Sequence, residues 1–166
     1  MIYIDCDGVL ADFHKKVLEL TGTGYNGKET WKVLEKYPRL FYNLDVMQGA
    51  RESVAMLVHK FRYSNVEVLT ALPLLTEQLV TAHKDKVQWV HKKIDPLIQV
   101  NAVQNWRLKK YFCNSIDDIL IDDNHRNIIE WEDAGGRGIL HTNWDETLKV
   151  VECCIKANAT LNRMLC

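Results

Sequence analysis

Two kinds of segment alternate along the chain, distinguished by the spacing of their hydrophobic residues. Short apolar runs typical of buried strands occur at residues 1–6, 65–70, 97–100, 118–121 and 137–140. The stretches between them carry apolar residues every three to four positions, as on one face of a helix. These stretches are residues 14–21, 49–61, 76–94, 106–113, 127–134 and 145–157, the last capped by Asp145. The alternation predicts an α/β fold: a Rossmann-like parallel sheet of about five strands with helices on both faces.

One stretch does not fit this alternation. Residues 22–48 are too long for an ordinary connection and contain mixed aromatic and polar positions. We expect residues 1–166 to form one domain, with a small helical cap at about 22–48 inserted after the first strand and helix. Residues 22–27 spell G-x-G-x-x-G, but this run follows a helical pattern rather than a strand, so it does not predict dinucleotide binding.

Composition excludes several classes of protein. The chain has 166 residues and a net charge of −1, which argues against strong binding of nucleic acid. No apolar run reaches the roughly 18 residues of a membrane span, and no secretory signal is visible at the N-terminus. We therefore expect a cytoplasmic protein without a membrane partner, whose five cysteines are free thiols. The sequence leaves a homodimer open.

Polar residues that suit a single reaction follow three of the predicted strands. Asp5 and Asp7 come after the first strand, Thr70 ends the second, and Asp122 and Asp123 end the fourth. Because the carboxyl ends of parallel strands meet at one edge of the sheet, these side chains should converge. Four carboxylates in one cleft repel each other, and a divalent cation relieves that repulsion. Oxygen ligands of this kind favour Mg²⁺, which in turn favours a phosphate substrate.

The same residues can supply the remaining chemistry. An aspartate can attack phosphorus to form an aspartyl-phosphate, and a second one can protonate the leaving alkoxide. The hydroxyl of Thr70 can bind a phosphoryl oxygen. A lysine is needed to neutralise charge in the transition state, and Lys109 and Lys110, which precede the fourth strand, are the candidates.

These segments resemble the motifs of a known superfamily. Residues 5–13, D-C-D-G-V-L-A-D-F, resemble motif I of the haloacid dehalogenase (HAD) superfamily; residues 66–70 resemble motif II and residues 119–123 motif IV. Residues 40–50 and 85–90 are similar to segments of the 5′(3′)-deoxyribonucleotidase family within it. One difference lies at residues 71–75, where that family has a lysine that helps to hold phosphate and this chain has none.

The resemblance implies a Mg²⁺-dependent phosphomonoesterase that acts on (deoxy)ribonucleoside monophosphates. It implies that Asp5 is the nucleophile, that Asp7 is the general acid and base, and that Thr70 binds phosphate. The metal would be held by Asp5, Asp7 and an acid of the Asp122–Asp123 pair. The resemblance also implies a lysine of motif III, for which we favour Lys109 over Lys110. Substrate contacts are expected from Thr70, Ala71, Trp31, Phe41 and Lys109.

Other interpretations stay open at this point. Trp31 and Phe41 fit the core of the cap as well as a substrate wall. The substrate could be another small phosphate or the 3′ end of a polynucleotide. A non-catalytic phosphate-binding module or a receiver of phosphoryl groups is an alternative of a different class, but a receiver carries its acid pair after the first strand rather than the fourth.

Overall fold

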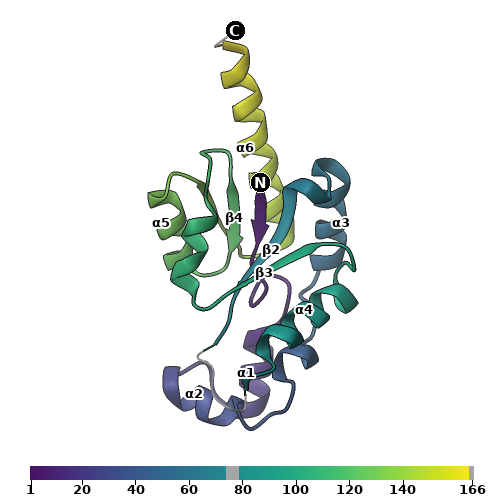
Figure 1. Ribbon diagram of the computed structural model, residues 1–166, viewed down its shortest axis with the longest axis vertical. Coiled ribbons are helices and arrows are strands. Elements are labelled where there is room, and N and C mark those ends of the chain that lie inside the picture. The colour runs from purple at the N-terminus through teal and green to yellow at the C-terminus, as the bar shows by residue number, and fades with distance from the viewer. Residues whose placement is uncertain (74–78, 165–166) are drawn as a thin grey trace.

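The computed structural model describes residues 1–73 and 79–164, with side chains up to residue 156. Within these residues the chain forms a five-stranded parallel sheet in the order β3-β2-β1-β4-β5 (Figure 1). The strands are β1 (Ile2–Ile4), β2 (Val66–Ala71), β3 (Gln99–Val103), β4 (Ile119–Asp122) and β5 (Arg137–Leu140). The fold class predicted from the sequence is confirmed.

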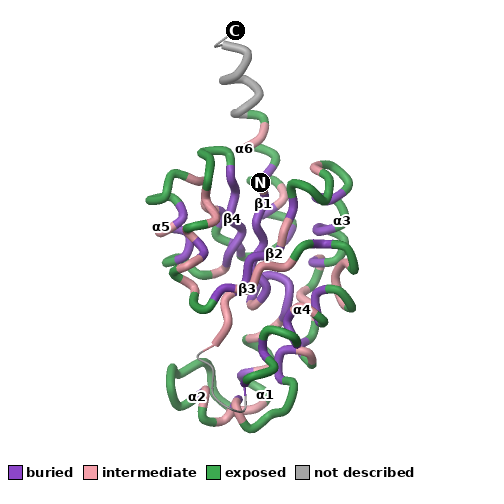
Figure 2. The backbone as a smooth tube through the Cα atoms, in the orientation of Figure 1, coloured by how far each residue is buried: buried purple, intermediate pink, exposed green. Residues whose placement is uncertain are grey.

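Helices cover both faces of the sheet, and successive strand residues point to opposite faces. Ile2 and Ile4 belong to the core shared with α3 (Ala50–Phe61) and α6 (Trp144–Met164). Tyr3 faces the other way and packs against Trp131 of α5 (His125–Asp133) and Phe112 of a 3₁₀ helix, η4 (Trp106–Phe112). Because helices cover both faces, the central strands β1 and β4 are buried at every residue, and Figure 2 shows this buried centre.

A helical segment lies beyond the carboxyl ends of the strands, next to α1 (Phe13–Thr21) (Figure 1). It consists of α2 (Gly27–Leu34) and the 3₁₀ helix η1 (Leu40–Asn43). The segment is fastened to α4 (Ala82–Lys93): Trp89 donates to the carbonyl of Leu44 at 2.8 Å, and Arg39 pairs with the buried Asp85 at 2.9 Å. We call residues 22–48 the cap.

Several predicted boundaries differ from the observed ones. The helix expected at 76–94 begins at Ala82, and residues 74–78 lie outside the described part. The strand expected at 97–100 is β3, Gln99–Val103. Asp145 does not cap α6, because the side chain of Asn143 accepts from the amide of Glu146 at 3.0 Å. Asp145 instead lies in the first turn, where a negative charge suits the helix dipole.

The structure also bears on the state of the cysteines and on membrane-spanning helices, within the described residues. Cys6, Cys113, Cys153 and Cys154 are all free thiols. No helix in the described ranges is long and apolar enough to cross a membrane.

Candidate active site

Three aspartates meet at the carboxyl edge of the sheet. Asp5 follows β1, Asp122 is the last residue of β4, and Asp123 follows it. One carboxylate oxygen of each lies within 4.8 Å of the others. The prediction that acids more than a hundred residues apart converge is confirmed. Their convergence follows from the parallel pairing of β1 with β4, extended by the hydrogen bond from the Asp5 amide to the Ile121 carbonyl at 2.9 Å.

Lys109 bridges two of these acids. Its Nζ lies 2.8 Å from Asp5 Oδ1 and 2.7 Å from Asp122 Oδ2, and the side chain is 2% exposed. Burial alone would lower the pKa of Lys109, but Asp5 and Asp122 raise it above its ordinary value, so the ammonium stays charged. Lys110 lies outside the site, because its Nζ pairs with Glu130 of α5 at 3.3 Å. The structure therefore separates the two lysines that the sequence left as alternatives.

A second buried lysine contacts the other acid of motif I. Lys86 of α4 is 1% exposed, and its Nζ lies 2.5 Å from Asp7 Oδ2 and 2.9 Å from Thr70 Oγ1. The same ammonium lies 4.6 Å from the centre of the Phe41 ring. Thr70 is fully buried beneath it, and Ala71 is the β2 residue that lines the cavity described below. Lys86 thus brings an ammonium to the end of β2, where the sequence showed no lysine in residues 71–75.

Asp122 and Asp123 differ in what surrounds them. The carboxylate of Asp122 is fully buried and accepts from Lys109, from Asn127 Nδ2 at 2.8 Å and from the amide of Asn124 at 2.8 Å. Asp123 lines the cavity, and its one described hydrogen bond joins Oδ2 to His14 Nε2 at 3.3 Å. Asp123 therefore has more oxygen lone pairs free for a ligand than Asp122 has.

The turn after β1 brings Asp123 close to the backbone. Gly8 has a φ of +79°, which favours glycine, and a Cβ built there would lie 2.0 Å from Asp123 Oδ2. The turn is closed by hydrogen bonds from the amides of Leu10 and Ala11 to the Cys6 carbonyl, each 2.8 Å long. A glycine at this position is what allows the acid after β4 to lie against the loop that carries Asp7.

The electrostatics of the site favour a divalent cation. Burial raises the pKa of the Asp5 carboxyl above its ordinary value; Lys109 opposes that rise, and Asp122 and Asp7 add to it. In the described residues, the four acids of the two motifs outnumber the two buried lysines beside them, and the contact of Asp123 with His14 is exposed. Asp7 Oδ1 is also buried, with no hydrogen-bond partner among the residues that the structure describes. The donor set, all oxygens, and this excess charge fit Mg²⁺.

A cavity of about 400 Å³ opens beside the acids. Asp5, Asp7, Asp123 and Lys109 line one part of it. The lining also includes five aromatic residues, which come from both the cap and the core: Phe13, Tyr25, Trp31, Phe41 and Trp106. Trp31 and Phe41, predicted as substrate contacts, therefore both line the cavity, and Phe41 also packs in the core.

Sequence reasoning missed some residues of this site. Lys86 occupies the buried stripe of α4 together with Ala82, Trp89 and Val90, and a lysine on an apolar stripe is a signal that a buried partner exists. His14, Tyr25 and Trp106 carried no comparable signal, because their positions depend on how the cap and η4 meet the sheet edge.

Comparison with known proteins shows a shared fold. No protein-family model matches the chain, and no curated protein matches its sequence. The structure is similar to that of a hydrolase from Streptococcus pneumoniae TIGR4, with a TM-score of 0.53 and 13% identity, covering 91% of this chain and 97% of that one. It is also similar to a hydrolase from Pseudomonas syringae, with a TM-score of 0.51 and 13% identity, covering 82% and 81%. At this identity the likeness establishes the fold.

Proposed function

We propose that this protein is a Mg²⁺-dependent phosphomonoesterase that works through an aspartyl-phosphate. The observation that carries the proposal is the meeting of Asp5, Asp122 and Asp123 within 4.8 Å, with Lys109 between two of them. The resemblance of motifs I, II and IV to the HAD superfamily supports it, and so does the description of both proteins of similar fold as hydrolases.

Asp5 is the nucleophile in this proposal. Its carboxylate oxygen attacks phosphorus, the bond from phosphorus to the ester oxygen breaks, and the phosphoryl group is left on Asp5. Asp7 gives a proton to the departing alkoxide and then takes one from the water that hydrolyses the intermediate. Because Lys86 holds Oδ2 of Asp7, the unpartnered Oδ1 is the atom that we assign to this proton transfer.

The remaining groups of the site would bind the metal ion and neutralise negative charge. Asp5, Asp123 and the backbone carbonyl of Asp7 would hold Mg²⁺, which when bound neutralises phosphoryl oxygens and orients them for attack. Lys109 offsets the charge that develops beside Asp5. Asp122, held by Lys109, Asn124 and Asn127, fixes the position of that lysine.

We propose (deoxy)ribonucleoside monophosphates as the substrates. A nucleoside offers a flat ring and a sugar, and the aromatic residues around the cavity suit the ring. The cavity of about 400 Å³ lies within the range of small-molecule sites.

Phosphate release from a panel of compounds tests this proposal. The panel contains deoxy- and ribonucleoside monophosphates, sugar phosphates and a 3′-phosphorylated oligonucleotide, each with Mg²⁺ and with EDTA, and Asp5→Asn is the inactive control. We expect release that requires Mg²⁺ and favours nucleoside monophosphates. Equal rates across the panel would instead indicate a general phosphatase, and no release from any compound would refute the proposal.

A further inference from the structure

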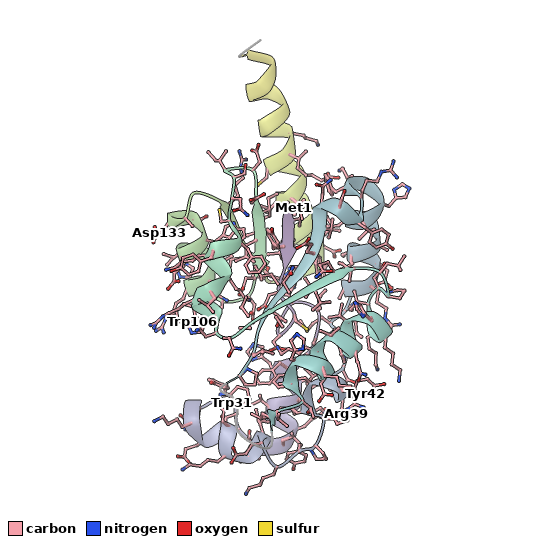
Figure 3. The ribbon with its side chains drawn as sticks, in the orientation of Figure 1. Met1, Trp31, Arg39, Tyr42, Trp106 and Asp133 are labelled. Atoms are coloured by element: carbon pink, nitrogen blue, oxygen red, sulfur yellow. The ribbon has the colours of Figure 1, made fainter. Side chains whose placement is uncertain are left out.

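Trp106 occupies an unusual position on the core side of the cavity. It is the first residue of the 3₁₀ helix η4, it is half-buried, and it lines the cavity. Asn105 caps this helix by accepting from the Arg107 amide at 3.0 Å, which fixes where the helix begins. Figure 3 places Trp106 on the core and Trp31 on the cap.

The geometry of η4 links Trp106 to the lysine of the site. A 3₁₀ helix has three residues per turn, so Trp106, Lys109 and Phe112 lie on one face of η4. Phe112 packs on Tyr3 in the core, and Lys109 reaches Asp5 and Asp122. Trp106 is one turn further along, about 6 Å beyond Lys109 at a rise of roughly 2 Å per residue. Both side chains line the same cavity, so the ring of Trp106 is available to the part of a substrate that extends away from Lys109.

Within the described residues, the ring of Trp106 has fewer aromatic contacts than the rings of the cap. Trp31 donates its Nε1 to Tyr25 Oη at 3.0 Å and packs beside Phe13, whose ring is stacked on Phe41. Among the described aromatic pairs, none includes Trp106; its described ring contact is with the neighbouring Arg107, 5.0 Å from the ring centre. A large, half-buried ring beside a cavity and without an aromatic neighbour is free to pack on a ligand.

We propose that Trp106 is a specificity residue: it forms the core-side wall against which a flat ring in the leaving group packs, across the cavity from Tyr25 and Trp31 of the cap. This inference rests on the proposed phosphomonoesterase function. It gives the core a contact with the leaving group, which neither the metal nor the acids would touch. With this contact, the site would distinguish substrates by the ring of the leaving group, a part that does not react.

Two substrates that differ only in the ring test this role. Deoxyadenosine 5′-monophosphate carries the base, and deoxyribose 5-phosphate does not. For Trp106→Ala we expect KM for the first to rise by about tenfold with little change in kcat, in line with the loss of one stacking contact. kcat/KM for the second should change by less than about twofold. Trp106→Phe should restore most of the discrimination, because it restores a ring.

Tyr111→Ala is the matched control, since Tyr111 is an aromatic residue of the same helix that is 72% exposed and lies outside the cavity lining. It should change neither substrate's kinetics. Equal losses on both substrates in Trp106→Ala, or no loss on either, would overturn the assignment.

A binding measurement separates this inference from the proposed function. Calorimetric titration with deoxyadenosine, which has the ring and no phosphate, needs no catalysis. We expect binding to the wild-type protein that is about tenfold weaker in Trp106→Ala and recovers in Trp106→Phe. Unchanged affinity in Trp106→Ala, or no binding to the wild type, would refute the role of Trp106. Absence of phosphate release alongside ring-dependent binding would refute the phosphatase and leave the role of Trp106 standing.

Discussion

Lys86 Nζ lies 2.5 Å from Asp7 Oδ2, although the two residues are 79 positions apart in the chain. The contact joins α4 to the loop after β1, and α4 in turn holds the cap through Asp85 and Arg39. One helix therefore fixes both the proposed general acid and the segment that covers it.

Replacing this lysine should impair proton transfer. Lys86→Met removes the contact that orients Asp7, and we expect kcat to fall by about 10²-fold with nucleoside monophosphates, the scale of a misplaced catalytic group. With p-nitrophenyl phosphate, whose leaving group needs no proton, the loss should be smaller. Lys84→Met is the control, because Lys84 is exposed on the same helix. Equal losses with both substrates would show that Lys86 does not act through Asp7.

Lys109 and Lys110 are adjacent in the chain, but replacing each by methionine should have very different effects on activity and stability. Lys109→Met leaves the buried Asp5 and Asp122 without their cation, so we expect activity to fall by about 10²-fold or more. The free energy of unfolding in EDTA should fall by about 3 kcal/mol. Lys110→Met should stay close to wild type in steady-state kinetics and in denaturant titration. A larger effect from Lys110→Met would contradict the placement of the two lysines.

Gly8→Ala tests the close approach of Asp123 to the loop. The added methyl group would collide with the Asp123 carboxylate, and the positive φ of Gly8 adds a backbone cost of about 1–2 kcal/mol. We expect weaker Mg²⁺ binding in calorimetry and a loss of phosphate release. Gly24→Ala is the matched control, since a Cβ at Gly24 meets nothing within 4 Å and its φ is not positive. Full Mg²⁺ affinity in Gly8→Ala would argue against Asp123 as a ligand.

His141 should make the fold sensitive to mild acid. Burial lowers the pKa of this imidazole, whose Nδ1 lies 2.9 Å from Thr147 Oγ1 and whose Nε2 has no partner among the described residues. The unfolded chain therefore takes up a proton at a higher pH than the folded one, so His141 makes the unfolding free energy fall as the pH drops below about 6.5.

Denaturant titrations at about pH 7.5 and about pH 5.5 measure this effect. The free energy of unfolding should fall less between these two pH values in His141→Gln than in the wild type. His59→Gln, which changes an exposed histidine, should behave as the wild type. An unchanged pH dependence in His141→Gln would show that another group is responsible.

The fold and the acidic centre could be predicted from the sequence because both depend on local patterns. Apolar runs mark the strands, and parallel pairing then forces the residues after β1 and β4 to one edge. Lys109 could be favoured over Lys110 but not fixed, since the choice depends on the three-residue turn of η4 and the pattern indicated only a helix. The partners of Lys86 and the wall formed by Trp106 depend on long-range packing that no local pattern encodes.

Trapping the phosphorylated protein tests whether Asp5 forms an aspartyl-phosphate. Asp7→Asn, given p-nitrophenyl phosphate and Mg²⁺, should accept the phosphoryl group and release it slowly, because the water that attacks the intermediate lacks its base. After acid quenching and proteolysis, mass spectrometry should find one phosphoryl group on the peptide that contains Asp5, and none when Asp5→Asn is added. A phosphoryl group on any other peptide, or turnover that persists without Asp5, would contradict the account.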